Sequence, residues 1–176
     1  MTHSGASVHA LKDGFVGEIT GLDLSLEIDV KVAAFLTKPH QNYPVLAIRD
    51  QSLGAEALMA YGAVFGGFDI DHHVSQYQDK EHPEVVYLTN RDTKGAPDPA
   101  SADRRIAWHV DSTFTKAPCA HMALRAMEIP SKGGGTHFAN MVQAYVTLPK
   151  NLKAAIEGRR ARHKFGASPV DGDIFQ

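Results

Sequence analysis

The stretch WHVDSTF (residues 108–114) places a histidine and a carboxylate two residues apart, at His109 and Asp111. In a β-strand, side chains two residues apart point to the same face, so this spacing predicts that His109 and Asp111 converge on one point. One imidazole and one carboxylate are two of the ligands of the 2-His-1-carboxylate triad, which binds non-haem iron(II) and leaves coordination positions open. A strand histidine hydrogen-bonded to a nearby carboxylate is the alternative, and the tripeptide alone leaves both open.

Elsewhere the pattern of apolar residues alternates between strand and helix periods. Strands are predicted over residues 16–24, 43–49, 85–88, 120–128 and 136–140, the fourth of them half-buried. Helices are predicted over 26–34, ending near Pro39, then from a Ser52 cap to the glycines at 66–67, and over 148–158. This mixture is compatible with several fold classes and does not select one.

Residues 91–105 (RDTKGAPDPASADRR) show no periodicity and predict a long loop. Loops longer than about 12–15 residues are uncommon in compact domains and often act as lids or binding loops. An ordinary surface insertion fits the same composition, so a lid and a simple insertion both remain open.

Length, composition and net charge exclude several classes of protein. A length of 176 residues, with 43% hydrophobic and 22% charged residues, predicts one globular domain over residues 1–176. The formal net charge of -2 provides no overall attraction to nucleic acid or to an anionic membrane, and we expect neither partner. The sequence contains no secretory signal and no apolar run of about 18 residues, so we expect a cytoplasmic protein. The single cysteine, Cys119, cannot form an intrachain disulfide.

A wider set of motifs surrounds WHVDSTF in a characteristic order. SKGGGTHFANM (131–141) and AYVTLPKNLKAAIEG (144–158) follow it, and GEITGLDL (17–24), VLAIRDQSL (45–53) and FGGF (65–68) precede it. From about Val16 to about Phe165, the sequence resembles the taurine dioxygenase and aryloxyalkanoate dioxygenase (TauD/TfdA) family of Fe(II)- and 2-oxoglutarate-dependent oxygenases. The resemblance implies a mainly β fold with flanking helices, a cupin-like double-stranded β-helix (jelly roll), here incomplete at the C-terminus.

The resemblance also assigns roles to individual residues. His109 and Asp111 match the first two iron ligands, and Thr136 matches the threonine that hydrogen-bonds the distal carboxylate of 2-oxoglutarate. Trp108 is expected to pack beneath the metal site. The cosubstrate 2-oxoglutarate would take two open metal positions and O2 the third. The implied activity is a dioxygenase that hydroxylates a small, anionic organic substrate of the sulfonate or aryloxyalkanoate type, with release of succinate and CO2.

The sequence departs from the family pattern at the third iron ligand and at the arginine that pairs with 2-oxoglutarate. The family completes its triad with a second histidine, and pairs an arginine with 2-oxoglutarate, in a region that this sequence does not match; it looks like the first three fifths of a family member. The local histidines are poor substitutes. His121 is expected to face outward, His137 to point to the face opposite its neighbour Thr136 if both lie on a strand, and His163 to be solvated. Arg125 is the one strand arginine that could meet the cosubstrate.

The sequence also offers candidate substrate-binding residues and alternative functions. His72, His73 and Arg105 are candidate substrate-binding residues, with a polar surface turn or a solvated arginine as the alternatives. An incomplete jelly roll exposes sheet edges, so we expect a homo-oligomer or another chain to cover them. The rival function is a truncated, catalytically incompetent family member that acts at most as a metal-binding or structural module. A zinc- or iron-dependent cupin-like hydrolase or isomerase fits the histidine–aspartate pair but explains GGGT poorly.

Overall fold

The computed structural model describes residues 5–11, 14–68, 70, 76–99, 108–163 and 174–175. The chain divides into two compact units, Met1–Ala107 with Met122–Arg125 and Trp108–His121 with Ala126–Gln176. The single-domain organisation of residues 1–176 stays a prediction.

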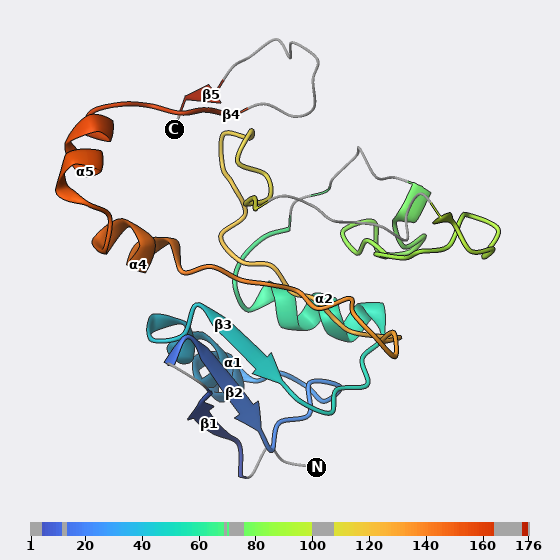
Figure 1. The fold of residues 1–176 in the computed structure, drawn as a ribbon. Helices are drawn as coiled ribbons and strands as arrows, with labels where there is room; N and C mark the ends of the chain where they lie inside the picture. Colours follow the sequence, from blue (N-terminus) through green and yellow to red (C-terminus); the bar gives the residue numbers. More distant parts are fainter. Residues whose placement is uncertain are drawn as a thin grey trace. The chain divides into compact units, whose positions relative to one another are not determined.

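The first unit contains a three-stranded sheet with the order β1-β2-β3 (Figure 1). Its strands are β1 (Ser7–Ala10), β2 (Val16–Thr20) and β3 (Val45–Ile48). β1 pairs antiparallel with β2, and β2 pairs parallel with β3, so that Ile19 of β2 lies opposite Val8 and Ile48. The strands predicted over 16–24 and 43–49 are confirmed in β2 and β3, whereas β1 was not predicted.

Two helices accompany this sheet. α1 (Val30–Thr37) begins at Asp29, whose side chain accepts a 2.8 Å hydrogen bond from the backbone N–H of Val32, and a 3-10 turn, η2 (Lys38–Gln41), extends it past Pro39. α2 (Ala55–Ala63) lies within the second predicted helix. Its predicted cap at Ser52 is wrong, because Leu53 is buried and the chain stays extended until Gly54 (φ -80°, ψ 177°), which is the N-cap.

The core of this unit forms where the sheet and the helices meet. Its buried members come from the strand, the following loop, α1 and the segment before α2: Ile19, Leu22, Leu24, Val32, Leu36 and Leu53. Leu58, Tyr61 and Phe65 are partly buried and pack against them. The rings of Tyr61 and Phe65 meet edge to face at 5.3 Å, and burial raises the pKa of Tyr61.

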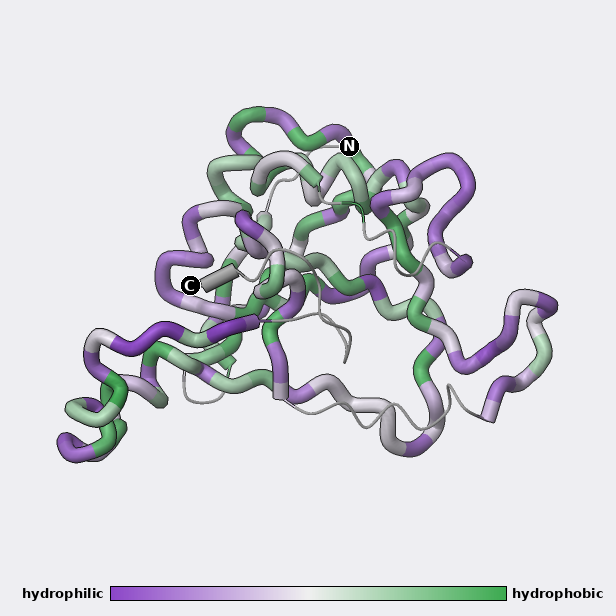
Figure 2. Tube along the Cα trace, turned by 90° about the horizontal axis from the view of Figure 1, so that it is seen from above, coloured by the Kyte–Doolittle hydropathy of each residue, from purple (hydrophilic) through white to green (hydrophobic). Residues whose placement is uncertain are grey.

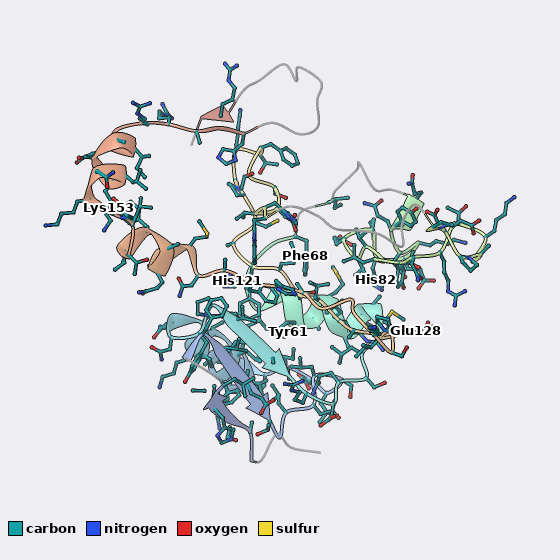
Figure 3. The ribbon with its side chains drawn as sticks, in the orientation of Figure 1. Tyr61, Phe68, His82, His121, Glu128 and Lys153 are labelled. Carbon is teal, nitrogen blue, oxygen red and sulfur yellow. The ribbon has the colours of Figure 1, made fainter. Side chains whose placement is uncertain are left out.

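Segment 76–99 is organised by tight turns rather than by strands. The strand predicted over 85–88 is wrong: only Val86 forms a bridge, with Gln78. The Tyr87 hydroxyl donates a 2.7 Å hydrogen bond to Asp79 Oδ2, and the backbone N–H groups of Glu81 and His82 donate to Oδ1 at 3.0 Å (His82 is labelled in Figure 3). These bonds stabilise the carboxylate and lower the pKa of Asp79, while the bond to Asp79 raises the pKa of Tyr87.

The second unit contains two short helices and a two-stranded sheet. α5 (Lys150–Ile156) confirms the predicted third helix, with Pro149 as its N-cap, and β4 (Arg162–His163) pairs antiparallel with β5 (Ile174–Phe175). α4 (Met141–Val146) was not predicted; Asn140 caps it by accepting a 2.9 Å hydrogen bond from the backbone N–H of Gln143. Both helices carry hydrophobic residues (Figure 2), many of them exposed. Every described helix is too short or too polar to cross a bilayer.

The strands predicted over 120–128 and 136–140 do not form ladders in the described structure. Met122 and Leu124 are exposed, and so is every residue from 126 to 147. An alternating pattern predicts which face a strand would bury, but a ladder also needs a neighbouring strand to accept its backbone hydrogen bonds. The described residues therefore form small sheets and helices, and the jelly roll is not directly seen.

Replacement of a core leucine tests this account of where stability lies. Leu36 of α1 is fully buried, and Val30 of the same helix is 85% exposed. Leu36→Ala should lower the free energy of unfolding by about 2–5 kcal/mol, because it leaves a cavity. Val30→Ala should change it by less than about 0.5 kcal/mol. Urea unfolding followed by circular dichroism measures both, and equal losses would contradict the placement of the core.

The hydrogen bond between Tyr87 and Asp79 predicts a pH effect. Because the pKa of Asp79 is lowered in the folded state, its contribution to stability is present above the unfolded pKa and is lost as pH falls through the folded pKa. Tyr87→Phe should raise the pKa of Asp79 toward its ordinary value and reduce that contribution. Carbon-detected NMR titration of the carboxyl group measures the change, with Tyr77→Phe as the control. An unchanged Asp79 pKa in Tyr87→Phe would show that the hydroxyl is not the cause.

Candidate metal centre

His109 and Asp111 converge as their spacing predicts. His109 Nε2 lies 3.1 Å from Asp111 Oδ1, and their side chains are 51% and 46% exposed, so both donor atoms are near solvent. A half-exposed pair of this kind is open to an ion that arrives from solution. The convergence of an imidazole and a carboxylate, the first element of the predicted site, is therefore present in the structure.

The two residues do not lie in a strand, the geometry from which their convergence was inferred; a turn begins at Asp111. Residues 111–114 form a turn in which the backbone N–H of Thr115 donates to the carbonyl of Ser112 at 3.0 Å. Ser112 has a φ of 57°, in the left-handed region that a serine rarely adopts. Trp108 is 71% exposed, so its expected packing beneath the metal site is also wrong for this structure.

The distance between the two donor atoms suits a metal ion. Two ligand atoms that each lie about 2.1 Å from one ion, at a right angle to each other, are about 3.0 Å apart. The 3.1 Å between His109 Nε2 and Asp111 Oδ1 matches neighbouring positions on an octahedral ion. The mixed imidazole–carboxylate donor set is the one that iron(II) accepts in facial sites. Without a metal, the same distance lets a ring N–H donate to the carboxylate.

A third protein ligand is not found in the described part of the chain. No group of three or more His, Cys, Asp or Glu side chains is arranged there to hold a metal ion. His121 and His137 are exposed and do not complete a set with His109 and Asp111. His163 lies in β4 and does not complete one either. The described residues thus offer the pair His109 and Asp111 and no third metal-ligating side chain beside it.

Thr136 follows a glycine turn, as the SKGGG motif predicts. Gly134 has a φ of 72°, and a Cβ at this position would lie 2.7 Å from Pro130 Cγ, so both backbone and space require glycine. Thr136 is exposed, in the extended segment that ends at the Asn140 cap of α4. Its hydroxyl can therefore reach a ligand from solution. Its role toward 2-oxoglutarate stays a prediction.

The substrate-binding candidates cannot be placed. His72, His73 and Arg105 lie outside the described residues. Of the loop predicted over 91–105, residues 91–99 are described and form a tight turn: the backbone N–H of Asp92 donates to the carbonyl of Ala96 at 2.8 Å, and Arg91 forms a bridge with Pro97. The first part of this segment is therefore ordered by its own hydrogen bonds.

Some polar contacts of the structure were not predicted from the sequence. The pair Asp79 and Tyr87 was not predicted, although the Asp-Lys-Glu-His run that begins at Asp79 is a signal for an Asp-capped turn. Arg125 was named only as a weak partner for the cosubstrate. Its Nε is buried and has no hydrogen-bond partner within the described residues.

Curated proteins of known activity match most of this chain. The alpha-ketoglutarate-dependent 2,4-dichlorophenoxyacetate dioxygenase of Burkholderia sp. (strain RASC) is 27% identical over 160 residues, which are 85% of this chain and 53% of that protein. An alkylsulfatase of Acinetobacter baylyi is 31% identical over 147 residues, 83% of this chain and 43% of that protein. The chain thus spans about half the length of these relatives.

Solved structures also superpose on most of this chain. A crystal structure of AAD-2 in complex with Mn(II) and N-oxalylglycine superposes with a TM-score of 0.71 at 27% identity, covering 93% of this chain and 56% of that one. A taurine dioxygenase from Burkholderia xenovorans superposes with a TM-score of 0.71 at 26% identity, covering 92% of this chain and 54% of that one. The fold is therefore that of part of a TauD-type dioxygenase.

The family assignment rests on the whole of this agreement. The model of the taurine catabolism dioxygenase TauD, TfdA family matches residues 7–172, which include both donor residues and the glycine turn. The enzymes of this family depend on Fe(II) and 2-oxoglutarate. The chain belongs to the TauD/TfdA family of dioxygenases.

Proposed function

We propose that this chain provides the iron- and cosubstrate-binding part of a 2-oxoglutarate-dependent dioxygenase that hydroxylates a small, anionic organic molecule. The observation that carries the proposal is the 3.1 Å separation of His109 Nε2 and Asp111 Oδ1, which suits adjacent positions on one octahedral ion. The relatives support the substrate class, because their names include a dichlorophenoxyacetate dioxygenase and a sulfate ester dioxygenase. Sulfonates, sulfate esters and aryloxyalkanoates all pair an apolar body with an anionic group.

In this proposal each residue has one task. When bound, iron(II) with 2-oxoglutarate and O2 supplies the oxidising chemistry that hydroxylates a C–H bond and releases succinate and CO2. His109 binds through Nε2 as a neutral imidazole, and Asp111 binds through Oδ1 as a carboxylate. The Thr136 hydroxyl donates a hydrogen bond to the distal carboxylate of 2-oxoglutarate and orients it.

The proposal also covers the parts of the site that the described residues do not contain. A third iron ligand and an arginine for 2-oxoglutarate come from another segment or from a second copy of the chain in a homo-oligomer. Segments 120–128 and 136–140 become strands of a jelly roll when a neighbouring strand covers them, because their backbone groups are then paired. His72, His73 and Arg105 contact substrate, and loop 91–105 acts as the lid. The substrate and O2 are the partners, without nucleic acid or a membrane.

One observation favours a second function. No set of three metal-ligating side chains occurs in the part of the chain that the structure describes. A chain with only two ligand positions would bind metal weakly and would not hold the cosubstrate in a fixed orientation. It would then be a catalytically incompetent family member that acts as a metal-binding or structural module. The two functions differ in whether the chain forms a complex with iron(II) and 2-oxoglutarate together.

Anaerobic titration with iron(II) and 2-oxoglutarate separates these functions. We expect a visible metal-to-ligand charge-transfer band with the unmodified chain, and loss of that band in both His109→Ala and Asp111→Ala. His9→Ala is the matched control, because the His9 ring is already bonded to the Ser7 hydroxyl at 2.8 Å in β1. A folded chain without a band would establish the second function, and a band retained in both variants would contradict the ligand assignment.

Thr136 is tested by the affinity for 2-oxoglutarate. Loss of one hydrogen bond to a charged group should weaken binding about tenfold in Thr136→Ala, while Thr136→Ser should retain most of the affinity. Thr147→Ala is the control, because the Thr147 hydroxyl donates to the carbonyl of Gln143 within its own helix at 2.9 Å. Isothermal titration in the presence of Mn(II) measures all three. Equal affinity in Thr136→Ala and Thr147→Ala would remove Thr136 from the site.

A further inference from the structure

Four consecutive exposed residues contain the candidate metal ligands. The side chains of His109 and Asp111 are 51% and 46% exposed, and the apolar residues that alternate with them, Trp108 and Val110, are 71% and 61% exposed. All four belong to one compact unit. The donor pair therefore lies in a stretch that is exposed along its whole length.

Two protein ligands leave a divalent metal ion incompletely coordinated. A structural zinc site has four protein ligands, and the facial triad of iron(II) has three. In the part of the chain that the structure describes, no third His, Cys, Asp or Glu side chain is arranged to join His109 and Asp111. The ion therefore needs further ligands, and an exposed pair is accessible to those of another molecule.

A second copy of the chain offers ligands of the required kind. It presents the same imidazole and carboxylate, and a two-fold axis through the metal ion brings both pairs to one point, as in the self-complementary interfaces of symmetric dimers. The two pairs together contain two histidines, so His109 of the second copy provides the second histidine of a 2-His-1-carboxylate set. Trp108 and Val110 adjoin the donors, and apolar side chains, above all tryptophan, are favourable at the centre of an interface.

The charge of the pair makes this association depend on the metal. The ionised Asp111 of each copy carries one negative charge, so two copies repel each other at the axis when no cation lies there. The two positive charges of a divalent cation balance two carboxylates, with both histidines neutral. We therefore expect the two copies to pair only when metal is bound.

We propose that one divalent metal ion joins two copies of this chain, bound by His109 and Asp111 of each copy. The inference rests on the ligand assignment of the proposed function, and it names a second copy as the source of the missing histidine. The dimer interface and the metal centre are then one place in the molecule, and two chains share one ion.

Zinc(II) is the probe that tests this inference, because it accepts imidazole and carboxylate ligands and has no redox chemistry. Sedimentation velocity of the whole chain, with and without Zn(II), measures the mass. We expect monomers without metal and dimers with it, and the change should saturate at about half an equivalent of Zn(II) per chain. Removal of the metal with EDTA should restore the monomer.

The fluorescence of Trp108 reports the same event from within the site. Trp108 is the single tryptophan of the chain and is mostly exposed, so we expect its emission maximum at long wavelength in the metal-free chain. Burial at the dimer axis should move the maximum to shorter wavelength as Zn(II) is added. This shift should follow the change in mass.

Variants of the two donors identify the ligands. His109→Ala and Asp111→Ala should both stay monomeric and keep the long-wavelength emission when Zn(II) is present. His121→Ala is the matched control, since His121 is an exposed histidine of the same compact unit, and it should dimerise like the unmodified chain. Far-UV circular dichroism shows whether each variant remains folded.

Three results would overturn the inference: a monomer that binds about one Zn(II) per chain, a chain that stays monomeric and binds no Zn(II), and a dimer that persists in both donor variants. The proposed function fails separately, because it requires the charge-transfer band with iron(II) and 2-oxoglutarate. A band from a monomeric chain keeps the proposed function and removes this inference, whereas a zinc-bridged dimer without a band does the reverse.

Discussion

The proposed chemistry depends on one short contact: His109 Nε2 and Asp111 Oδ1 lie 3.1 Å apart, just before a turn at residues 111–114. The turn depends on Ser112, whose backbone adopts a φ of 57° and whose carbonyl accepts both the N–H and the hydroxyl of Thr115. Strained backbone of this kind persists only where surrounding bonds hold it. The 3.1 Å between the two atoms is compatible with two arrangements. Either the imidazole N–H donates a hydrogen bond to the carboxylate, or both atoms bind one metal ion.

The stability of the fold and its chemistry are carried by different parts of the chain. The buried hydrophobic residues found in the described structure extend from Ile19 to Leu53, and they join the sheet to α1 and α2. The donor pair and the glycine turn before Thr136 lie in the later part, where residues 126–147 are all exposed. Apolar side chains such as Met127, Ile129 and Val142 are exposed there, which is unfavourable in water. The chain spans about half the length of the relatives that it matches.

Sequence patterns predicted strands correctly where the described chain also contains the neighbouring strand with which each one pairs. β2 and β3 pair with each other, and the predicted strands over 16–24 and 43–49 are confirmed. Segments 120–128 and 136–140 have a strand pattern and no pairing strand in the described structure, so periodicity alone could not predict their state. The convergence of His109 and Asp111 was predicted from strand geometry, and it occurs although the two residues do not lie in a strand. The isolation of Arg125 Nε and the bond between Tyr87 and Asp79 depend on tertiary packing, which no local pattern encodes.

The most direct test of the metal centre is paramagnetic broadening of backbone amide signals by Mn(II), which binds the same donor set as iron(II). Mn(II) is also the ion in the AAD-2 complex with N-oxalylglycine. With substoichiometric Mn(II) and 2-oxoglutarate, the account predicts that signals near His109, Asp111 and Thr136 broaden first and together. Broadening centred on other histidines, with the signals near His109 and Asp111 still sharp, would contradict it.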